Sequence, residues 1–136
     1  MSPYDVDLRG EPPVAVMALR GNIDRDAMAS LTKAYEAAVV ADPKVVLLDF
    51  RNVDYINSTG IALIVGVLGR ARAESRRVLA SGLTEHYERI FAITRLSDFI
   101  QVYADVESAV DGASTRESQQ VHDTEQVHDG VQGSVT

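Results

Sequence analysis

Residues 48–63 read LDFRNVDYINSTGIAL, and they contain the end of an apolar strand, a polar segment and the start of an apolar helix. The apolar run Val-Val-Leu-Leu at residues 45–48 leads into this stretch and is typical of a short strand buried on both faces. The strand is expected to end at Phe50, and the mostly polar residues after it predict a loop. A helix is expected over residues 58–72, and between Ile61 and Leu68 it is apolar almost all round, which predicts burial on most sides.

Outside this stretch, periods of two and of 3.6 residues alternate along the chain. A hairpin is expected at the start, because turn residues separate the first two apolar runs. Asp24 has the position of an N-cap before the first helix, and Asp105 before the last. The expected strands cover residues 4–8, 14–19, 44–50, 76–80 and 99–103, and the expected helices cover residues 28–39, 58–72, 83–94 and 105–110.

This order predicts an α/β fold with one mixed, mostly parallel sheet of four to five strands and about four helices. The loop between residues 50 and 58 then lies at the carboxyl end of a parallel strand. Sites in α/β proteins commonly lie at that edge.

Composition excludes several function classes. The chain has 136 residues, of which 46% are hydrophobic, and a net charge of −7, which argues against nucleic acid as a partner. It has no cysteine, so a disulfide framework and a thiolate metal site are excluded.

The apolar stretch at residues 56–69 is too short to span a bilayer, and the first ten residues do not resemble a signal peptide. We expect a cytoplasmic protein without a membrane partner.

Residues 112–136 differ from the rest of the chain. They contain no Leu, Ile, Phe, Tyr or Met, and Arg116 is their only basic residue against four carboxylates. This composition predicts a disordered acidic tail after a domain at residues 1–111. The motif QVHD occurs at residues 120–123 and again at 126–129. We interpret it as a duplication rather than a metal site, because no fixed scaffold holds the ligands. No metal or cofactor is expected.

Ser58 stands where the helix begins, and two interpretations of its hydroxyl are open. As an N-cap, it would accept an N–H of the first turn, while Gly60 would let another backbone approach closely. As a phosphorylation site, it would hold a phosphate that the helix N-terminus favours electrostatically. The added charge would change a docking surface more than the fold.

The stretch resembles the signature of the STAS family, the sulfate-transporter and anti-sigma-factor-antagonist domain. The resemblance is carried by Asp49, Val53, Ile56, Asn57, Ser58, Thr59, Gly60, Ile61 and Leu63. It extends over about residues 4–110 and includes LRGNID at 19–24, GLT at 82–84 and ITRLSDF at 93–99. The chain is similar in particular to bacterial anti-sigma factor antagonists, so the resemblance implies a small STAS-like α/β layer.

That resemblance implies regulation by partner switching and no enzymatic activity. In such antagonists, a serine is phosphorylated by a protein kinase that is also the anti-sigma factor, and a serine phosphatase reverses the modification. The unphosphorylated antagonist binds the kinase and frees the sigma factor. Carried to this chain, the acceptor is Ser58, with Thr59 the second candidate. The implied partner-binding surface comprises Asp24, Asp54, Asn57, Ser58, Thr59 and Gly60. The sequence leaves open whether the protein forms a homodimer.

Two positions depart from the family pattern. Asn57 stands where Asp is most common, so hydrogen bonding is kept but a charge is lost. Arg95 stands where a glycine is usual, either as a surface residue or as a partner contact. The alternative function is therefore a non-switching STAS scaffold in a stress-signalling complex, or a regulatory subunit associated with transport.

Two other patterns have more than one interpretation. INSTG differs from the G-x-S-x-G nucleophile elbow at Ile56, and His86 lies among surface charges, which argues against a serine hydrolase. A basic run follows the buried helix, either as a solvated helix end or as a docking patch for an acidic partner. It consists of Arg70, Arg72, Arg76 and Arg77.

Overall fold

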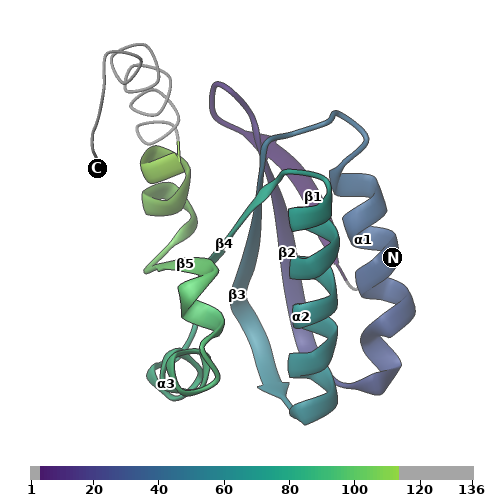
Figure 1. Cartoon of the computed structure of the whole chain (residues 1–136), viewed down its shortest axis with the longest axis vertical. Coiled ribbons are helices and arrows are strands. Elements are labelled where there is room, and N and C mark those ends of the chain that lie inside the picture. The colour runs from purple at the N-terminus through teal and green to yellow at the C-terminus, as the bar shows by residue number, and fades with distance from the viewer. Residues whose placement is uncertain (1–3, 114–136) are drawn as a thin grey trace.

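The computed structural model describes residues 4–113. Its strands form one sheet in the order β1-β2-β3-β4-β5 (Figure 1). They are β1 (Asp5–Arg9), β2 (Val14–Ile23), β3 (Val45–Ile56), β4 (Arg77–Ser81) and β5 (Ile100–Tyr103). β1 pairs with β2 antiparallel, and every other pair is parallel. The predicted mixed, mostly parallel sheet is therefore confirmed.

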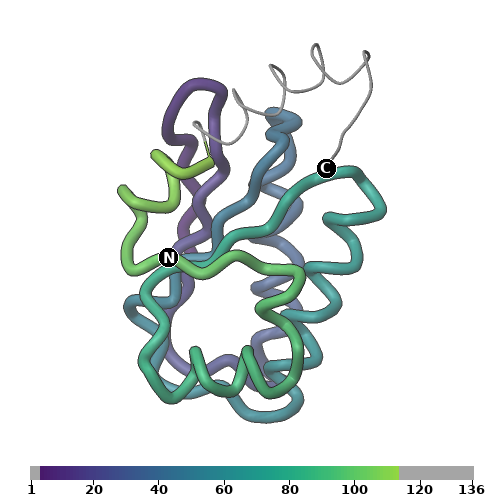
Figure 2. The backbone as a smooth tube through the Cα atoms, turned by 60° about the vertical axis from the view of Figure 1, so that its left-hand side comes forward, coloured from purple at the N-terminus to yellow at the C-terminus, as the bar shows by residue number. Residues whose placement is uncertain are grey.

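Helices cover both faces of this sheet, as Figures 1 and 2 show. They are α1 (Met28–Ala38), α2 (Ser58–Ala73), α3 (Glu85–Ile93) and a C-terminal helical segment, residues 106–113. Two short 3-10 turns, η1 (Arg25–Ala27) and η2 (Leu96–Asp98), precede α1 and β5. The first three helices pack on one face of the sheet and the C-terminal helical segment on the other.

β2 illustrates why the sheet needs both layers. Ala15, Met17 and Leu19 belong to the large apolar cluster under α1, α2 and α3, whereas Val14 and Val16 belong to the cluster under the C-terminal helical segment. This is the two-residue alternation of a strand with two buried faces. Each large aliphatic side chain that becomes fully buried contributes roughly 1.5–3 kcal/mol to stability. The apolar pattern of residues 14–19 therefore predicted a central strand, as observed.

β2 and β3 are longer than the sequence predicts. β3 continues to Ile56, so the loop predicted after residue 50 is wrong, and β2 continues to Ile23. Beyond the pair Asp49 and Ser81, β4 no longer follows β3, and β2 and β3 continue as a two-stranded pair. Most side chains of β3 are exposed after residue 50. An exposed pair satisfies its backbone hydrogen bonds without apolar side chains, so the sequence pattern contains no signal for it.

The C-terminal helical segment also exceeds its prediction. Asp105 caps it as expected, because its Oδ1 accepts the N–H of Ser108 at 2.8 Å. Gly112 and Ala113, assigned to the tail from composition, are helical, and Ala113 is buried. The remainder of the predicted tail, including both His–Asp pairs, lies outside the described residues. Within residues 4–113, no helix is long and apolar enough to cross a membrane.

Candidate functional site

The candidate site lies where the extended pair of β2 and β3 ends. Ile23 and Ile56 are paired at the last position of the register, so η1 and α2 begin side by side. The N–H of Asn57 donates to the carbonyl oxygen of Ile23 at 3.3 Å. Gly60 then packs on the same carbonyl, and a Cβ added at Gly60 would lie 1.9 Å from its oxygen. The close backbone approach expected at Gly60 is thus found, and the neighbouring backbone is that of Ile23.

Asn57, and not Ser58, caps α2. The backbone of Asn57 is extended, and its Oδ1 accepts the N–H of Gly60 at 2.8 Å. Ser58 is the first residue of the helix and its side chain is exposed. The interpretation of the Ser58 hydroxyl as the N-cap is therefore wrong, because the residue before it already fills that role. Aspartate would accept the same hydrogen bond at position 57, so the departure from the family pattern leaves this local structure intact.

Asp24 is an N-cap, as predicted, and it caps η1. Its Oδ1 accepts the N–H of Asp26 at 3.0 Å, and its backbone oxygen accepts the N–H of Ala27 at 2.9 Å. Burial, and then the negative charge of Asp24, raise the pKa of Tyr4 above its usual value of 10.0. Tyr4 is buried and therefore stays neutral at pH 7 beside this carboxylate.

The two caps border one open depression of about 320 Å³. It is lined by Asp24, Arg25, Asp26, Asn57 and Thr59. Three of the predicted partner-binding residues thus come together here. Arg25 and Asp26 were missed by sequence reasoning, although charged residues directly after an N-cap are a usable signal.

The other predicted residues take different positions. Gly60 is buried and does not line the depression, and Ser58 is exposed on the first turn of α2, between the lining residues Asn57 and Thr59. Asp54 is exposed on β3 and does not line the depression. It is the extra residue at a register shift, because Gly21 pairs with Val53 and the next residue of β2 pairs with Tyr55.

Tyr87 supports the floor of the site from α3. Its Oη accepts the N–H of Ile56 at 2.9 Å, and the phenol is buried. Thr84 caps α3 and holds Tyr87 in place, because its Oγ1 accepts the N–H of Tyr87 at 3.3 Å. The sequence assigned Tyr87 only to an apolar stripe, since a helical period gives no information on the partner of a hydroxyl.

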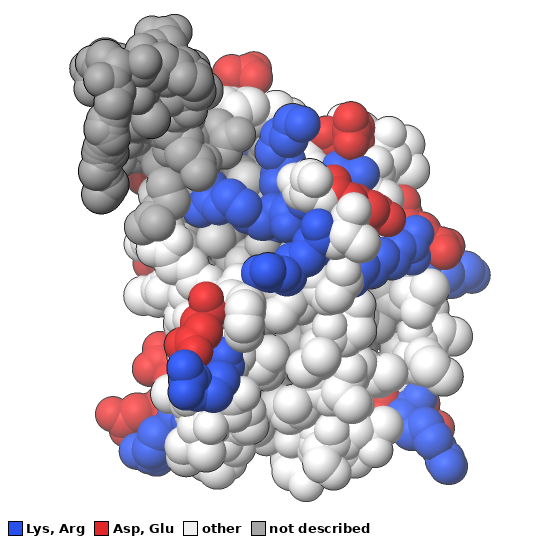
Figure 3. All heavy atoms as spheres, in the orientation of Figure 1, with Lys and Arg blue, Asp and Glu red and all other residues white. Residues whose placement is uncertain are grey.

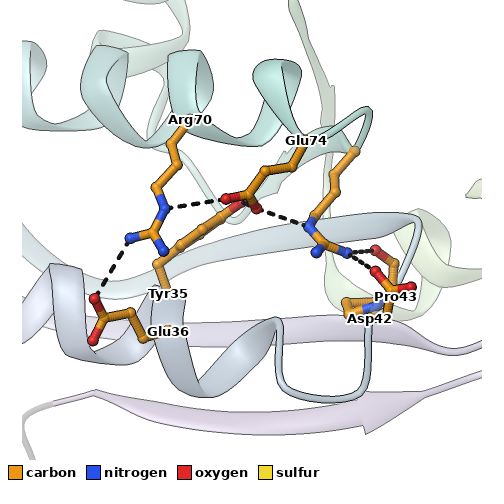
Figure 4. A network of polar contacts seen from close by, with 7 residues as sticks. Tyr35, Glu36, Asp42, Pro43, Arg70 and Glu74 are labelled. Atoms are coloured by element: carbon orange, nitrogen blue, oxygen red, sulfur yellow. Dashed lines mark hydrogen bonds and ion pairs between the residues drawn. The ribbon is translucent and has the colours of Figure 1, made fainter.

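A polar network ties the opposite end of α2 to α1 (Figure 4). The Tyr35 hydroxyl donates to Glu74 at 2.7 Å, and Arg70 lies 3.3 Å from Glu74 and 3.7 Å from Glu36. Arg76 pairs with Glu74 at 3.1 Å and also with Asp42. Two arginines of the basic run therefore have structural roles inside the domain.

Comparison with protein families matches residues 6–102 to the family described as "Mlab, STAS domain". The match covers the whole extended pair of β2 and β3, both caps and α2. The chain belongs to the STAS domain family. The resemblance found in residues 48–63 is thereby confirmed, together with the fold it implies.

The curated relatives of this STAS domain are regulatory proteins. The anti-sigma-B factor antagonist of Listeria monocytogenes serovar 1/2a is 32% identical over 92 residues, which are 68% of this chain and 80% of that protein. The anti-sigma-B factor antagonist of Staphylococcus aureus strain NCTC 8325 is 32% identical over 57 residues, which are 42% of this chain and 53% of that protein.

Solved structures share the same STAS fold. A putative anti-sigma factor antagonist from Thermotoga maritima has a TM-score of 0.69 at 14% identity, covering 80% of this chain and 92% of that one. The antagonist SpoIIAA in its unphosphorylated form has a TM-score of 0.63 at 15% identity, covering 82% and 97%. The phosphorylated form of Bacillus SpoIIAA also gives 0.63, at 17% identity, covering 81% and 98%.

Proposed function

We propose that this STAS domain is an anti-sigma factor antagonist that acts by partner switching. In this proposal, unmodified chain binds an anti-sigma factor that is a serine kinase, and a sigma factor is released. Phosphorylation of Ser58 ends that binding, and a serine phosphatase restores it. The observation that carries the proposal is that Asn57 caps α2, which leaves Ser58 exposed on the first turn. The relatives named as anti-sigma-B factor antagonists support the role.

The first turn of α2 suits a phosphate. The first N–H groups of a helix have no acceptor within the helix. In α2, the N–H of Gly60 donates to the Oδ1 of the cap Asn57. A phosphate on Ser58 would lie at the positive end of the helix dipole, which favours the anion. The modification therefore needs no unfolding.

The same phosphate would change the binding surface sharply. It adds a charge of about −1.5 to −2 beside the depression that already contains Asp24 and Asp26. Arg25 is the basic residue lining the depression, and its single charge does not balance the three anionic groups. A partner that fits the unmodified hydroxyl through hydrogen bonds and shape would then have to bury a bulkier, charged group without an opposite charge. An unpaired charge buried at an interface costs several kcal/mol.

Four tagged forms of the full chain test the proposal by co-purification from cells of the source organism. They are the wild type, Ser58→Ala, Ser58→Glu and the control Ser75→Glu. Ser75 is an exposed serine in the turn after α2, so the control adds the same charge at the opposite end of that helix. Wild type, Ser58→Ala and Ser75→Glu should retain an anti-sigma factor kinase. Ser58→Glu should lose at least about tenfold of it, because burying an unpaired carboxylate at an interface costs a few kcal/mol and tenfold corresponds to only about 1.4 kcal/mol.

Purified kinase with ATP then identifies the acceptor. Wild type and Thr59→Ala should gain one phosphate, located by fragment mass spectrometry on Ser58, and Ser58→Ala should gain none. Equal retention of partners by Ser58→Ala and Ser58→Glu would overturn the switch. Such partners would instead indicate a scaffold if they were other STAS proteins or transport components.

A further inference from the structure

A second cavity, of about 370 Å³, lies at the opposite end of α2 from Ser58. It opens where β4 begins and β5 has not yet joined the sheet, because the first pair between them is Val78 with Ile100. Its lining includes Leu68, Arg72, Arg76, Arg77, Phe99 and Gln101. Figure 3 shows basic side chains gathered on the upper half of the molecular face that it draws.

The three arginines at the cavity differ in their surroundings. Arg76 is a framework residue, with a side chain only 11% exposed and held by Asp42 and Glu74. Arg72 is exposed, and its guanidinium lies 4.9 Å from the centre of the Phe99 ring. A guanidinium stacked on a ring keeps its in-plane N–H donors available for a carboxylate.

Arg77 brings positive charge to the other side of the cavity. It is half-buried at the start of β4 and, by strand alternation, shares a face with Leu79. Asp98 also lines the cavity, but its carboxylate is held by Arg95 at 2.7 Å. Three arginines and one carboxylate therefore line the cavity, although the domain as a whole is acidic.

We propose that this cavity binds the acidic C-terminal segment of the same chain, residues 114–136. Residues 1–113 have a net charge of −4 and residues 114–136 have −3, which together make the −7 of the chain. The net negative charge of the domain disfavours the segment overall, whereas the arginine-rich cavity lined by Arg72 and Arg77 favours it. The carboxylates that would bind there are those of Glu117, Asp123, Glu125 and Asp129.

The point where the described chain ends supports this occupant. Ala113 is buried in the cluster that contains Val45 and Leu79. Leu79 also lines the cavity, and Val45 is the partner of Arg77 in the sheet register. The segment therefore leaves the domain on the face that Arg77 shares. A chain of this length is long enough for its carboxylates to reach around the sheet edge, because even a random coil of that many residues has a root-mean-square span of about 25 Å.

Tethering lowers the affinity that this contact needs. An attached segment faces its site at an effective concentration in the millimolar range, so a site with a dissociation constant near about 1 mM is already about half occupied. The contact should therefore be removed by salt, since the screening length is about 3 Å at 1 M. It lies at the far end of α2 from Ser58, so it leaves the phosphoacceptor surface uncovered.

Paramagnetic broadening in the full chain tests the proposal. The chain has no cysteine, so Gln126→Cys provides a single site for a nitroxide between the two groups of carboxylates. At about 10 mM salt, where screening extends about 30 Å, we expect broadening of the Arg72 Nε–H and of the amides of Val78 and Gln101. Their intensities should fall at least about twofold, as for a mostly occupied tethered site. The amides of Ser58 and Thr59 should keep theirs, and 1 M salt should restore all signals.

Matched variants decide what causes the broadening. In the labelled chain, Arg72→Gln with Arg77→Gln should abolish it, and Arg25→Gln with Arg89→Gln should not, because those arginines are exposed elsewhere. A third variant exchanges the four carboxylates of the segment for amides, which leaves the folded domain untouched, and it should also abolish the broadening.

Three outcomes would overturn the proposal. The first is full intensity at the cavity, and the second is broadening that persists in the Arg72 and Arg77 variant. The third is broadening that arises only between a labelled chain and a separate ¹⁵N chain, which would assign the contact to a second copy.

Discussion

The carbonyl oxygen of Ile23 lies so close to Gly60 that a Cβ there would be 1.9 Å from it. This contact joins the end of β2 to the first turn of α2 and thereby places the Asp24 cap beside the Asn57 cap. The contact partner is backbone, which cannot rotate away as a side chain can. The geometry of the site therefore depends on the missing side chain at Gly60.

Gly60→Ala should destabilise the domain by about 1–3 kcal/mol, the usual cost of overpacking. Gly66→Ala is the matched control on the same helix, because a Cβ there meets nothing within 4 Å. Alanine at that exposed position should stabilise the domain by about 0.5–1 kcal/mol through helix propensity. Urea unfolding of both variants measures the difference. A Gly60→Ala domain as stable as the wild type would contradict the packing argument.

Asn57→Ala should lower the free energy of unfolding by about 0.5–2 kcal/mol, because it removes the N-cap of α2. Asn57→Asp keeps an acceptor at the same place, and the helix dipole favours its charge, so stability should be unchanged or higher. Ser58→Ala should stay within about 0.5 kcal/mol of wild type, as an exposed residue without a capping role. Thermal and urea unfolding check all three. A larger loss for Ser58→Ala than for Asn57→Ala would return the cap to Ser58.

Tyr87→Phe should cost about 1–3 kcal/mol, because the N–H of Ile56 loses its acceptor in a buried position. The effect should be local, since Phe fills nearly the same volume. Hydrogen exchange at the Ile56 amide should accelerate more than exchange at the central residues of β3. If both accelerate equally, the hydroxyl supports the whole domain and not the floor of the site.

The Tyr35–Glu74 network predicts a pH dependence of stability. Hydrogen bonds from Tyr35 first, and then from Arg76, lower the pKa of Glu74 below its usual 4.5. A lowered pKa in the folded state means that the stabilisation is complete above that value and is lost as the pH falls through the folded-state pKa. The difference in free energy of unfolding between wild type and Glu74→Gln should therefore shrink on acidification below pH 4.5. A difference that stays constant through this range would contradict the role of the carboxylate.

Removal of residues 114–136 should leave the melting temperature nearly unchanged, because the contacts proposed for this segment are exposed ion pairs worth about 1 kcal/mol or less. The truncation should end after Ala113, whose buried methyl group belongs to the cluster under the C-terminal helical segment. Calorimetry of the full chain and of this truncation checks the expectation. A large loss of stability would place part of the segment in the fold.

The sequence by itself determined the order of the elements and the faces they bury. The alternation at residues 14–19 and the apolar run at residues 45–48 each specify which side chains are buried, and burial is what such periods encode. For α2 the prediction of burial on most sides was wrong, because only one face packs on the sheet and Val65 and Ala62 are exposed. Caps also depend on neighbours in the chain, so Asp24 and Asp105 were predicted correctly. The glycine at position 60 also predicted that another backbone segment approaches the first turn of α2 closely.

Contacts between distant segments determine which backbone approaches Gly60, how far β2 and β3 extend, and which residue caps α2. Pairing beyond residue 50 joins exposed segments and therefore leaves no hydrophobic period to read. The choice of Asn57 over Ser58 depends on where the extended strand ends, which is fixed by its distant partner Ile23. The basic run also takes its roles from tertiary contacts. Arg70 and Arg76 form ion pairs, whereas Arg72 and Arg77 line an open cavity, because α1 and β4 lie beside α2. Interactions between segments far apart in the chain fix these features, and no local period records them.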